Sequence, residues 1–165
     1  VDKVRHSLQA ANRCRGALRH PIQVVNGKRQ FVRVDLSAGF DPDRRSDDIH
    51  ALILDALGAW GAEGDSLDIT GLFGLAERRF GQGAHVSQVL AAVQNIEGVN
   101  WVRVDAFQPI PLGSPPETDP TELTPPASPV REKRIDCNGD TLLSLYQDHL
   151  VINLSADSVA EACDP

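Results

Sequence analysis

The chain has 165 residues, of which 41% are hydrophobic and 24% charged, and its formal net charge is −7. This is the composition of an ordinary soluble domain with a core of its own, and no apolar run has the length of a membrane span. The three cysteines have no CxxC spacing, so they indicate neither a zinc site nor a complete disulfide framework. Because Met is absent even at position 1, we expect a segment of a longer protein.

Charge is distributed unevenly along the chain. Residues 1–34 hold eight Lys or Arg against Asp2 alone, a charge of +7, so the remainder must carry −14 to give the total. Such asymmetry permits an acidic partner for the N-terminal end, including a nucleic acid. No aromatic residue interleaves the basic ones before Phe31, however, and the whole chain is acidic. A solvated helix face beside an acidic body is therefore the simpler interpretation.

The N-terminal segment, 1–21, is predicted to be a helix over Asp2–Leu18 because Val4, Leu8, Ala11 and Leu18 share one face. A core domain should follow over 22–107. It begins with a predicted hairpin of Ile22–Val25 and Gln30–Ala38. Its turn is Asn26-Gly27, a pair that readily takes the positive φ angles of a type I′ turn. In the second strand apolar and charged residues alternate, which is typical of a sheet with one covered face.

The strongest helix prediction runs from Ile49 to Trp60, where apolar residues recur at helical spacing, and Gly61 should stop it. Acidic residues precede this helix, and dipole complementation at an N-terminus explains them without a metal ion. A short strand is predicted at Leu67–Thr70. The next stretch, Leu72–Arg79, is ambiguous between a helical turn and an extended connection.

A second helix is predicted from the N-cap Ser87 to Glu97, with Gly98 closing it. The pattern then changes to period two, which indicates a strand. One face of that strand should carry Val102, Val104 and Ala106, and the other Trp101, Arg103, Asp105 and Phe107. The two helices should lie on the same side of the sheet and share one core, formed by Val34, Leu52, Ile53, Leu57, Val89, Leu90, Val93, Ile96 and Val104.

Composition changes abruptly after Phe107. Eight of the eleven prolines lie in 108–130, which predicts an extended connector. Beyond it, 131–155 should form a small strand-turn-strand element that packs on the core, with strands at Lys133–Cys137 and His149–Leu154 around a helical turn at Leu142–Tyr146. The last stretch, 156–165, reads as a frayed tail.

The predicted order of the core elements is β-α-β-β-α-β. It favours a two-layer, ferredoxin-like α+β sandwich, with the N-terminal helix and the C-terminal strand-turn-strand element as additions. Asp136, Asn138 and Asp140 have the spacing of a calcium-loop start. Thr141 and Gln147, however, stand where the turn glycine and the bidentate Glu belong, so we interpret this stretch as a turn. For His85 we expect a solvated or capping role. We predict no catalytic, cofactor-binding or metal-binding residue and no enzymatic activity.

A family resemblance is carried by motifs between Phe80 and Phe107. In order these are Phe80-Gly81-Gln82, Val86-Ser87-Gln88-Val89, Gly98-Val99 and Val102–Phe107. Together they resemble the C-terminal region of the baseplate J-like family, wedge proteins of contractile phage tails and related injection machines. The similarity runs from about Ile22 to Leu112 and more loosely to Leu154. The family has a longer N-terminal part than this chain.

The resemblance implies a structural subunit. It would bind other baseplate proteins, of the wedge and of the hub, and copies of itself. It would need no cofactor, small-molecule substrate, nucleic acid or membrane insertion. It would lie in the bacterial cytoplasm during assembly and then in the baseplate of a phage or prophage-derived tail. Candidate interface residues are Phe73, Trp101 and Phe107, unless a second layer of this chain covers them. The alternative function is a small ligand-binding or enzymatic ferredoxin-like domain.

Overall fold

The computed structural model describes residues 2–13, 26–61, 69–111 and 125–157. Its helices are α1 (Asp2–Arg13), α2 (Ser46–Leu57) and α3 (Val86–Gln94), with a 3₁₀ turn η2 (Gln147–His149). Its strands are β1 (Lys28–Phe40), β2 (Ala84–His85), β3 (Val99–Pro109), β4 (Arg134–Ile135), β5 (Thr141–Ser144) and β6 (Leu150–Ala156). None of the described helices combines the length and the apolar character that crossing a membrane requires.

The main sheet is organised around β1. One edge of β1 pairs with β3 in antiparallel fashion, and the other edge pairs in parallel with β5 near Lys28 and with β6 from Val34 onward. The small β2 pairs only with β4 among the described strands. The fold is thus α+β, with a mixed sheet. This strand order does not confirm the predicted ferredoxin-like arrangement, because β5 and β6 belong to the sheet itself and do not pack on it as a separate element.

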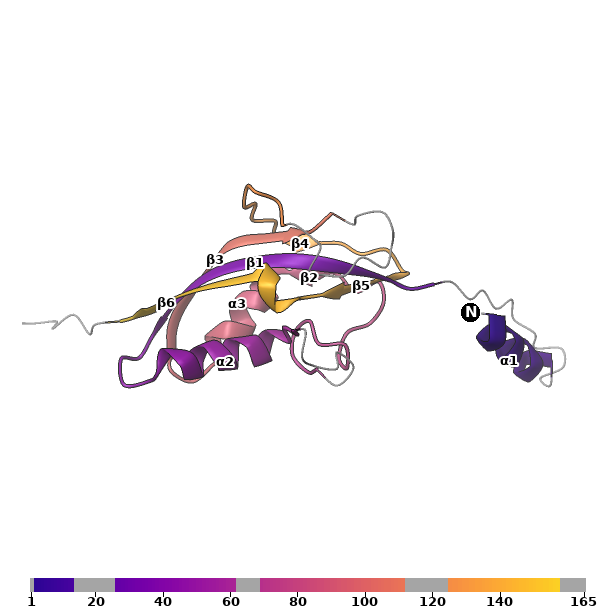
Figure 1. The fold of residues 1–165 in the computed structure, drawn as a ribbon, viewed down its shortest axis with the longest axis horizontal. Helices are drawn as coiled ribbons and strands as arrows, with labels where there is room; N and C mark the ends of the chain where they lie inside the picture. Colours follow the sequence, from indigo (N-terminus) through magenta and orange to yellow (C-terminus); the bar gives the residue numbers. More distant parts are fainter. Residues whose placement is uncertain (1, 14–25, 62–68, 112–124, 158–165) are drawn as a thin grey trace, which may run out of the picture.

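Both α2 and α3 lie on one side of the sheet (Figure 1). They cover the face of β1 formed by Val32, Val34, Leu36, Ala38 and Phe40. Most of the predicted core is confirmed: Ile53, Leu57, Val89 and Val93 are buried in one cluster with Val34 and Val104, and Leu90 and Ile96 pack against it. Leu52 was wrongly placed in the core. It follows the buried Ile49 by three positions, but it lies on the outward side of α2 and is exposed.

A glycine ends α2, whereas α3 ends at an asparagine. Gly58 adopts φ 66° directly after Leu57, and its amide donates to the carbonyl of Asp55 at 2.9 Å, so α2 stops before the predicted Gly61. Trp60 is already strand-like: its amide donates to the carbonyl of Leu145 at 3.2 Å. Helix α3 ends at Gln94 with Asn95 as its C-cap, three residues before the predicted Glu97, so Gly98, with φ 94°, turns the chain before β3 but does not close the helix as predicted.

The start of α3 lies two residues earlier than predicted. The N-cap is His85, not Ser87, and the backbone N–H of His85 donates to Gln88 Oε1 at 2.9 Å. His85 thus occupies the N-cap position and its side chain is exposed, in agreement with the expected solvated or capping role.

Other expectations concern residues that the structure describes only in part. The predicted strand Ile22–Val25, the first half of Leu67–Thr70 and the end of the N-terminal helix beyond Arg13 lie outside the described residues, and the described half, Ile69 and Thr70, is not a strand. So do residues 112–124 of the proline-rich segment and residues 158–165 of the tail.

The described ends of the proline-rich segment belong to the folded body. Pro109 is still part of β3, and Ile110 is buried against Phe31 and Tyr146. The domain boundary predicted after Phe107 therefore falls inside a strand.

Near the C-terminus, Asp157 donates its backbone N–H to the carbonyl of Phe40 at 2.9 Å, which fixes the end of β6.

The C-terminal region contains more sheet than predicted. The expected helical turn at Leu142–Tyr146 is wrong, because this stretch begins with β5 and all five of its side chains are buried. Apolar residues on consecutive positions suit a strand enclosed on both faces as well as they suit a helical turn. The turn before it is confirmed: the backbone N–H of Thr141 donates to the carbonyl of Asn138 at 2.9 Å.

The ambiguous stretch after α2 is a loop built around a buried Arg78. Its guanidinium donates to the carbonyls of Leu72, Gln82 and Gly83 and lies 5.3 Å from the centre of the Phe73 ring. Burial lowers the pKa of Arg78. Phe73 is completely buried in the core, so this aromatic side chain does not reach the surface.

Candidate functional site

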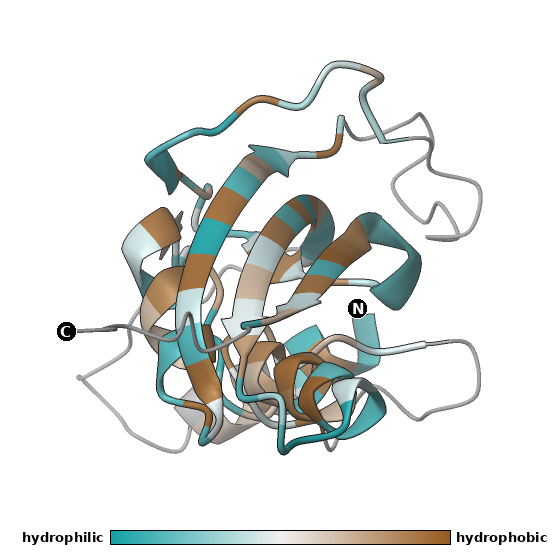
Figure 2. Ribbon diagram, turned by 90° about the vertical axis from the view of Figure 1, so that its left-hand side faces the viewer, coloured by the Kyte–Doolittle hydropathy of each residue, from teal (hydrophilic) through white to brown (hydrophobic). Residues whose placement is uncertain are grey.

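The face of the sheet opposite the helices carries polar residues. On β1 these positions are Arg33, Asp35, Ser37 and Gly39, and we call this side, with its neighbours on β3 and β6, the polar face. Apolar and polar bands alternate along the strands in Figure 2, as expected for a sheet that is helix-covered on one side only. The cross-strand neighbours of these positions are Gln108, Ala106, Arg103 and Trp101 on β3, and Val151, Asn153 and Ser155 on β6.

A bulge in β3 decides which side chains belong to this face. Ala106 is opposite Asp35 and Val104 is opposite Leu36, so Asp105 is an extra residue without a partner on β1. Beyond the bulge the alternation is reversed. Ala106 therefore lies on the polar face and Phe107 on the helix side, opposite Val34, contrary to the sequence prediction.

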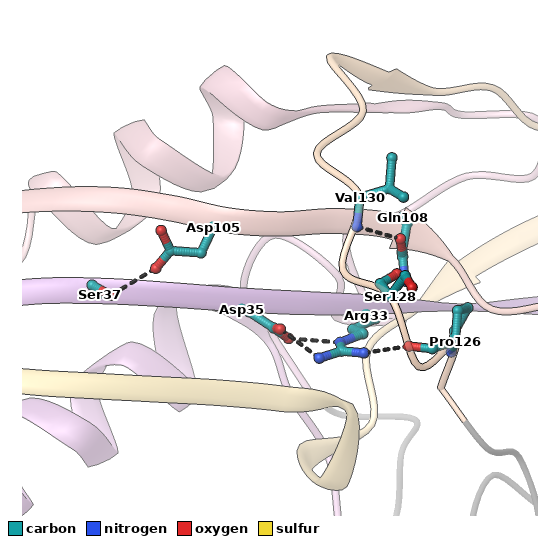
Figure 3. Close-up of polar contacts among 8 residues, drawn as sticks. All are labelled: Arg33, Asp35, Ser37, Asp105, Gln108, Pro126, Ser128 and Val130. Atoms are coloured by element: carbon teal, nitrogen blue, oxygen red, sulfur yellow. Dashed lines mark hydrogen bonds and ion pairs between the residues drawn. The ribbon is translucent and has the colours of Figure 1, made fainter.

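One end of the polar face is organised by an ion pair between Arg33 and Asp35. Nε and Nη2 of Arg33 donate to the two carboxylate oxygens of Asp35 at 2.8 and 2.6 Å, a bidentate arrangement (Figure 3). Hydrogen bonding to Asp35 raises the pKa of Arg33. Both side chains are mostly buried, so this pair is shielded from solvent.

The chain itself covers this end. The remaining Arg33 nitrogen, Nη1, donates to the carbonyl of Pro126 at 2.5 Å, and the backbone N–H of Val130 donates to Gln108 Oε1 at 2.7 Å (Figure 3). Phe107 also donates its backbone N–H to the carbonyl of Val130 at 2.9 Å. Residues 126–130 therefore form a strap over this part of the sheet.

The middle of the face is centred on Asp105, the bulge residue. Its Oδ2 accepts a hydrogen bond from Ser37 Oγ at 2.6 Å, and its Oδ1 accepts one from Arg103 Nε at 2.6 Å. Both hydrogen bonds lower the pKa of Asp105, and the bond from Ser37 has a larger effect than the bond from Arg103. At neutral pH this carboxylate is ionised and already has two donors, which suits a structural role better than proton transfer.

The other end of the face, which the described residues leave open, carries Trp101. The indole N–H of Trp101 donates to Asp157 Oδ1 at 3.0 Å, and Asn100 Nδ2 donates to the second oxygen at 3.3 Å. The ring lies over Gly39, where any Cβ would collide with it. Trp101 is nevertheless 41% exposed, and Val151 on the same face is 43% exposed. The indole is thus held in place while it remains accessible.

The three interface candidates from the sequence have different positions. Phe73 and Phe107 are completely buried in the core cluster, so the chain itself covers them. Trp101 alone reaches the surface. Val151 was missed as an exposed residue because it stands between two other apolar residues, Leu150 and Ile152. The sequence does not reveal the register of this strand with β1, so it does not show which of them faces outward. Asp157 was missed because it lies in the predicted tail.

The described residues contain no group of three or more His, Cys, Asp or Glu side chains arranged to hold a metal ion. Comparison of the chain with protein-family models and with curated proteins finds no match.

Proposed function

We propose that this chain is a structural subunit that binds other protein subunits through the open end of the polar face. The observation that carries the proposal is Trp101, an exposed aromatic ring fixed by Asp157 and seated on Gly39. Trp is enriched among the residues that dominate binding energy at protein interfaces. A ring that is already fixed loses little side-chain entropy when a partner covers it.

The charges around Trp101 also suit a protein partner. Arg103 and Asp105 form an ion pair within the face, and Asp157 is engaged by two donors. A partner that covers this surface would find the charges of Arg103 and Asp105 already paired, and it would need a basic group only for Asp157, whose two donors are neutral. Val151 offers a second apolar contact on the same side of the sheet.

The proposed assembly is a baseplate of the contractile-tail type, with wedge and hub proteins as partners. Support comes from the resemblance of the motifs between Phe80 and Phe107 to the baseplate J-like family. Those motifs occupy the end of the Arg78 loop, α3 and β3, so they include the strand that carries Trp101. A two-layer sandwich of the ferredoxin-like kind, with helices on one side and a polar sheet face on the other, remains part of this proposal.

The test is co-purification of the full-length protein with the proteins encoded beside it, repeated with Trp101→Ala. We expect the variant to keep its fold and to lose about 30-fold or more in partner affinity, the effect of removing an interface hot spot. Phe80→Ala is the matched control, since Phe80 is also an exposed aromatic residue but lies in the loop before α3. Equal partner affinity of wild type and Trp101→Ala, measured by titration, would contradict the proposal.

A further inference from the structure

Helix α1 presents an apolar stripe to solvent. Val4 and Leu8 are 54% and 43% exposed, and with Ala11 they recur at i, i+4 and i+7, on one side of the helix. Lys3 and Arg5 lie on the two flanks of this stripe, roughly 100° to either side. The result is an apolar strip with a basic residue on each border.

Such a helix is not expected to be stable without a partner. It has 12 residues, a length at which an isolated helix is marginal in water, and in proteins the stability of a helix comes mainly from packing of its apolar face. All the described side chains of α1 are exposed. In Figure 1, α1 lies beyond the β5 end of the sheet, apart from the other labelled elements. Its apolar stripe is therefore free to contact another surface.

A complementary surface exists on α2. Leu52 is 45% exposed, and Asp48 and Asp55 lie four residues before it and three after it, on the same outward side. Ile49, Ile53 and Leu57 occupy the neighbouring side of the helix, centred roughly 100° from Leu52, and anchor it in the core. The exposed surface around Leu52 thus combines an apolar side chain with two carboxylates on the flank away from the core, and their charge is opposite to that of the basic residues on α1.

We propose that α1 of one copy of this chain packs on the outward side of α2 of a second copy. Val4 and Leu8 would cover Leu52, and Lys3 and Arg5 would lie beside Asp48 and Asp55. The second copy is the occupant because one sequence carries both complementary surfaces. A two-fold exchange forms the same contact twice, which doubles a contact area that would be small for one short helix. This inference concerns the helices and does not depend on the proposed role of Trp101.

Charge reversal in solution tests the exchange. Light scattering or sedimentation should show that the full chain is a dimer. The variants Lys3→Glu/Arg5→Glu and Asp48→Lys/Asp55→Lys should each raise the dissociation constant of the dimer at least about tenfold. Mixed together, the two variants should form a one-to-one heterodimer, because every α1–α2 contact in that species again joins opposite charges. The matched control is Arg131→Glu/Lys133→Glu, which reverses two exposed basic residues elsewhere and should remain a dimer.

Three results would overturn the proposal. The first is a wild-type chain that remains monomeric at the highest concentrations reached. The second is dimerisation that both charge reversals leave unchanged. The third is the absence of a heterodimer in the mixture, which would mean that α1 packs on α2 of its own chain or on neither. If the α2 variant does not fold, Leu8→Glu provides an independent test, since Leu8 lies outside the core, and it should also give a monomer.

Discussion

The two faces of β1 differ in what their side chains contact. Every second residue from Val32 to Phe40 is apolar and buried against the helices, whereas Arg33, Asp35 and Ser37 on the other face form ion pairs and hydrogen bonds. Burial of a Val, Leu or Phe side chain contributes about 1.5–3 kcal/mol, while a more exposed ion pair such as Arg103–Asp105 contributes about 0–1 kcal/mol. We infer that the helix-covered face supplies most of the stability. The polar face is therefore freer to vary for binding.

The largest expected effect is on the covered face. Leu57→Ala should lower the free energy of unfolding by about 2–5 kcal/mol, because Leu57 is completely buried and its truncation leaves a cavity. His50→Ala on the same helix is the control, because His50 is exposed and is not part of the proposed contact around Leu52, and it should change the free energy of unfolding by about 0.5 kcal/mol or less. Urea unfolding of the two variants measures the difference, and similar costs would mean that α2 presents another side to the sheet.

An intermediate effect is expected at the strapped end of the polar face. Asp35→Asn should cost about 1.5–3 kcal/mol, because Arg33 loses a charged, bidentate acceptor in a mostly buried position. Arg103→Gln affects the more exposed pair with Asp105 and should cost about 1 kcal/mol or less. Denaturant titration would show whether this order is correct. Equal costs at the two pairs would mean that the strap does not shield Arg33 and Asp35.

The smallest expected effect is on the pKa of Asp105, the bulge residue of β3. The pKa of Asp105 is below its ordinary value of 3.8, so the folded state favours the ionised form. The corresponding stabilisation is complete above the ordinary pKa and is lost as the pH falls through the lowered value. Ser37→Ala removes the largest cause of the shift and should move the pKa of Asp105 upward. An NMR titration of the carboxyl carbon measures this, and an unchanged pKa would mean that Ser37 does not donate to it in solution.

Local patterns predicted much of this architecture. The apolar spacing in α2 and α3 identified both helices and nearly all of their buried residues, because the period of a helix is visible in neighbouring positions. Leu52 shows where this reasoning failed. An apolar residue next to a buried stripe has the same local pattern whether the sheet covers it or not. On the polar face, the sequence identified Trp101 but gave no sign that Asp157 holds its indole N–H.

Features that depend on distant contacts were not predictable from the sequence. A single bulge residue, Asp105, moved Phe107 from the predicted outer side into the core, and nothing in a run of alternating residues announces such an insertion. Arg78 is buried because three carbonyls of its own loop surround it, whereas arginine as a residue type suggests a surface position.

The parallel pairing of β1 with β5 and β6 bears on how the protein acquires its structure during synthesis. Val34 and Leu150 are neighbours in the sheet although most of the chain separates them in sequence. Contacts of this kind form late, since closing a long loop costs entropy before any pairing compensates for it. We expect β1 and β3 to pair first, leaving one side of β1 unpaired until the ribosome has released the last strand. Pulse-labelling hydrogen exchange would then show that β6 amides become protected after those of β3.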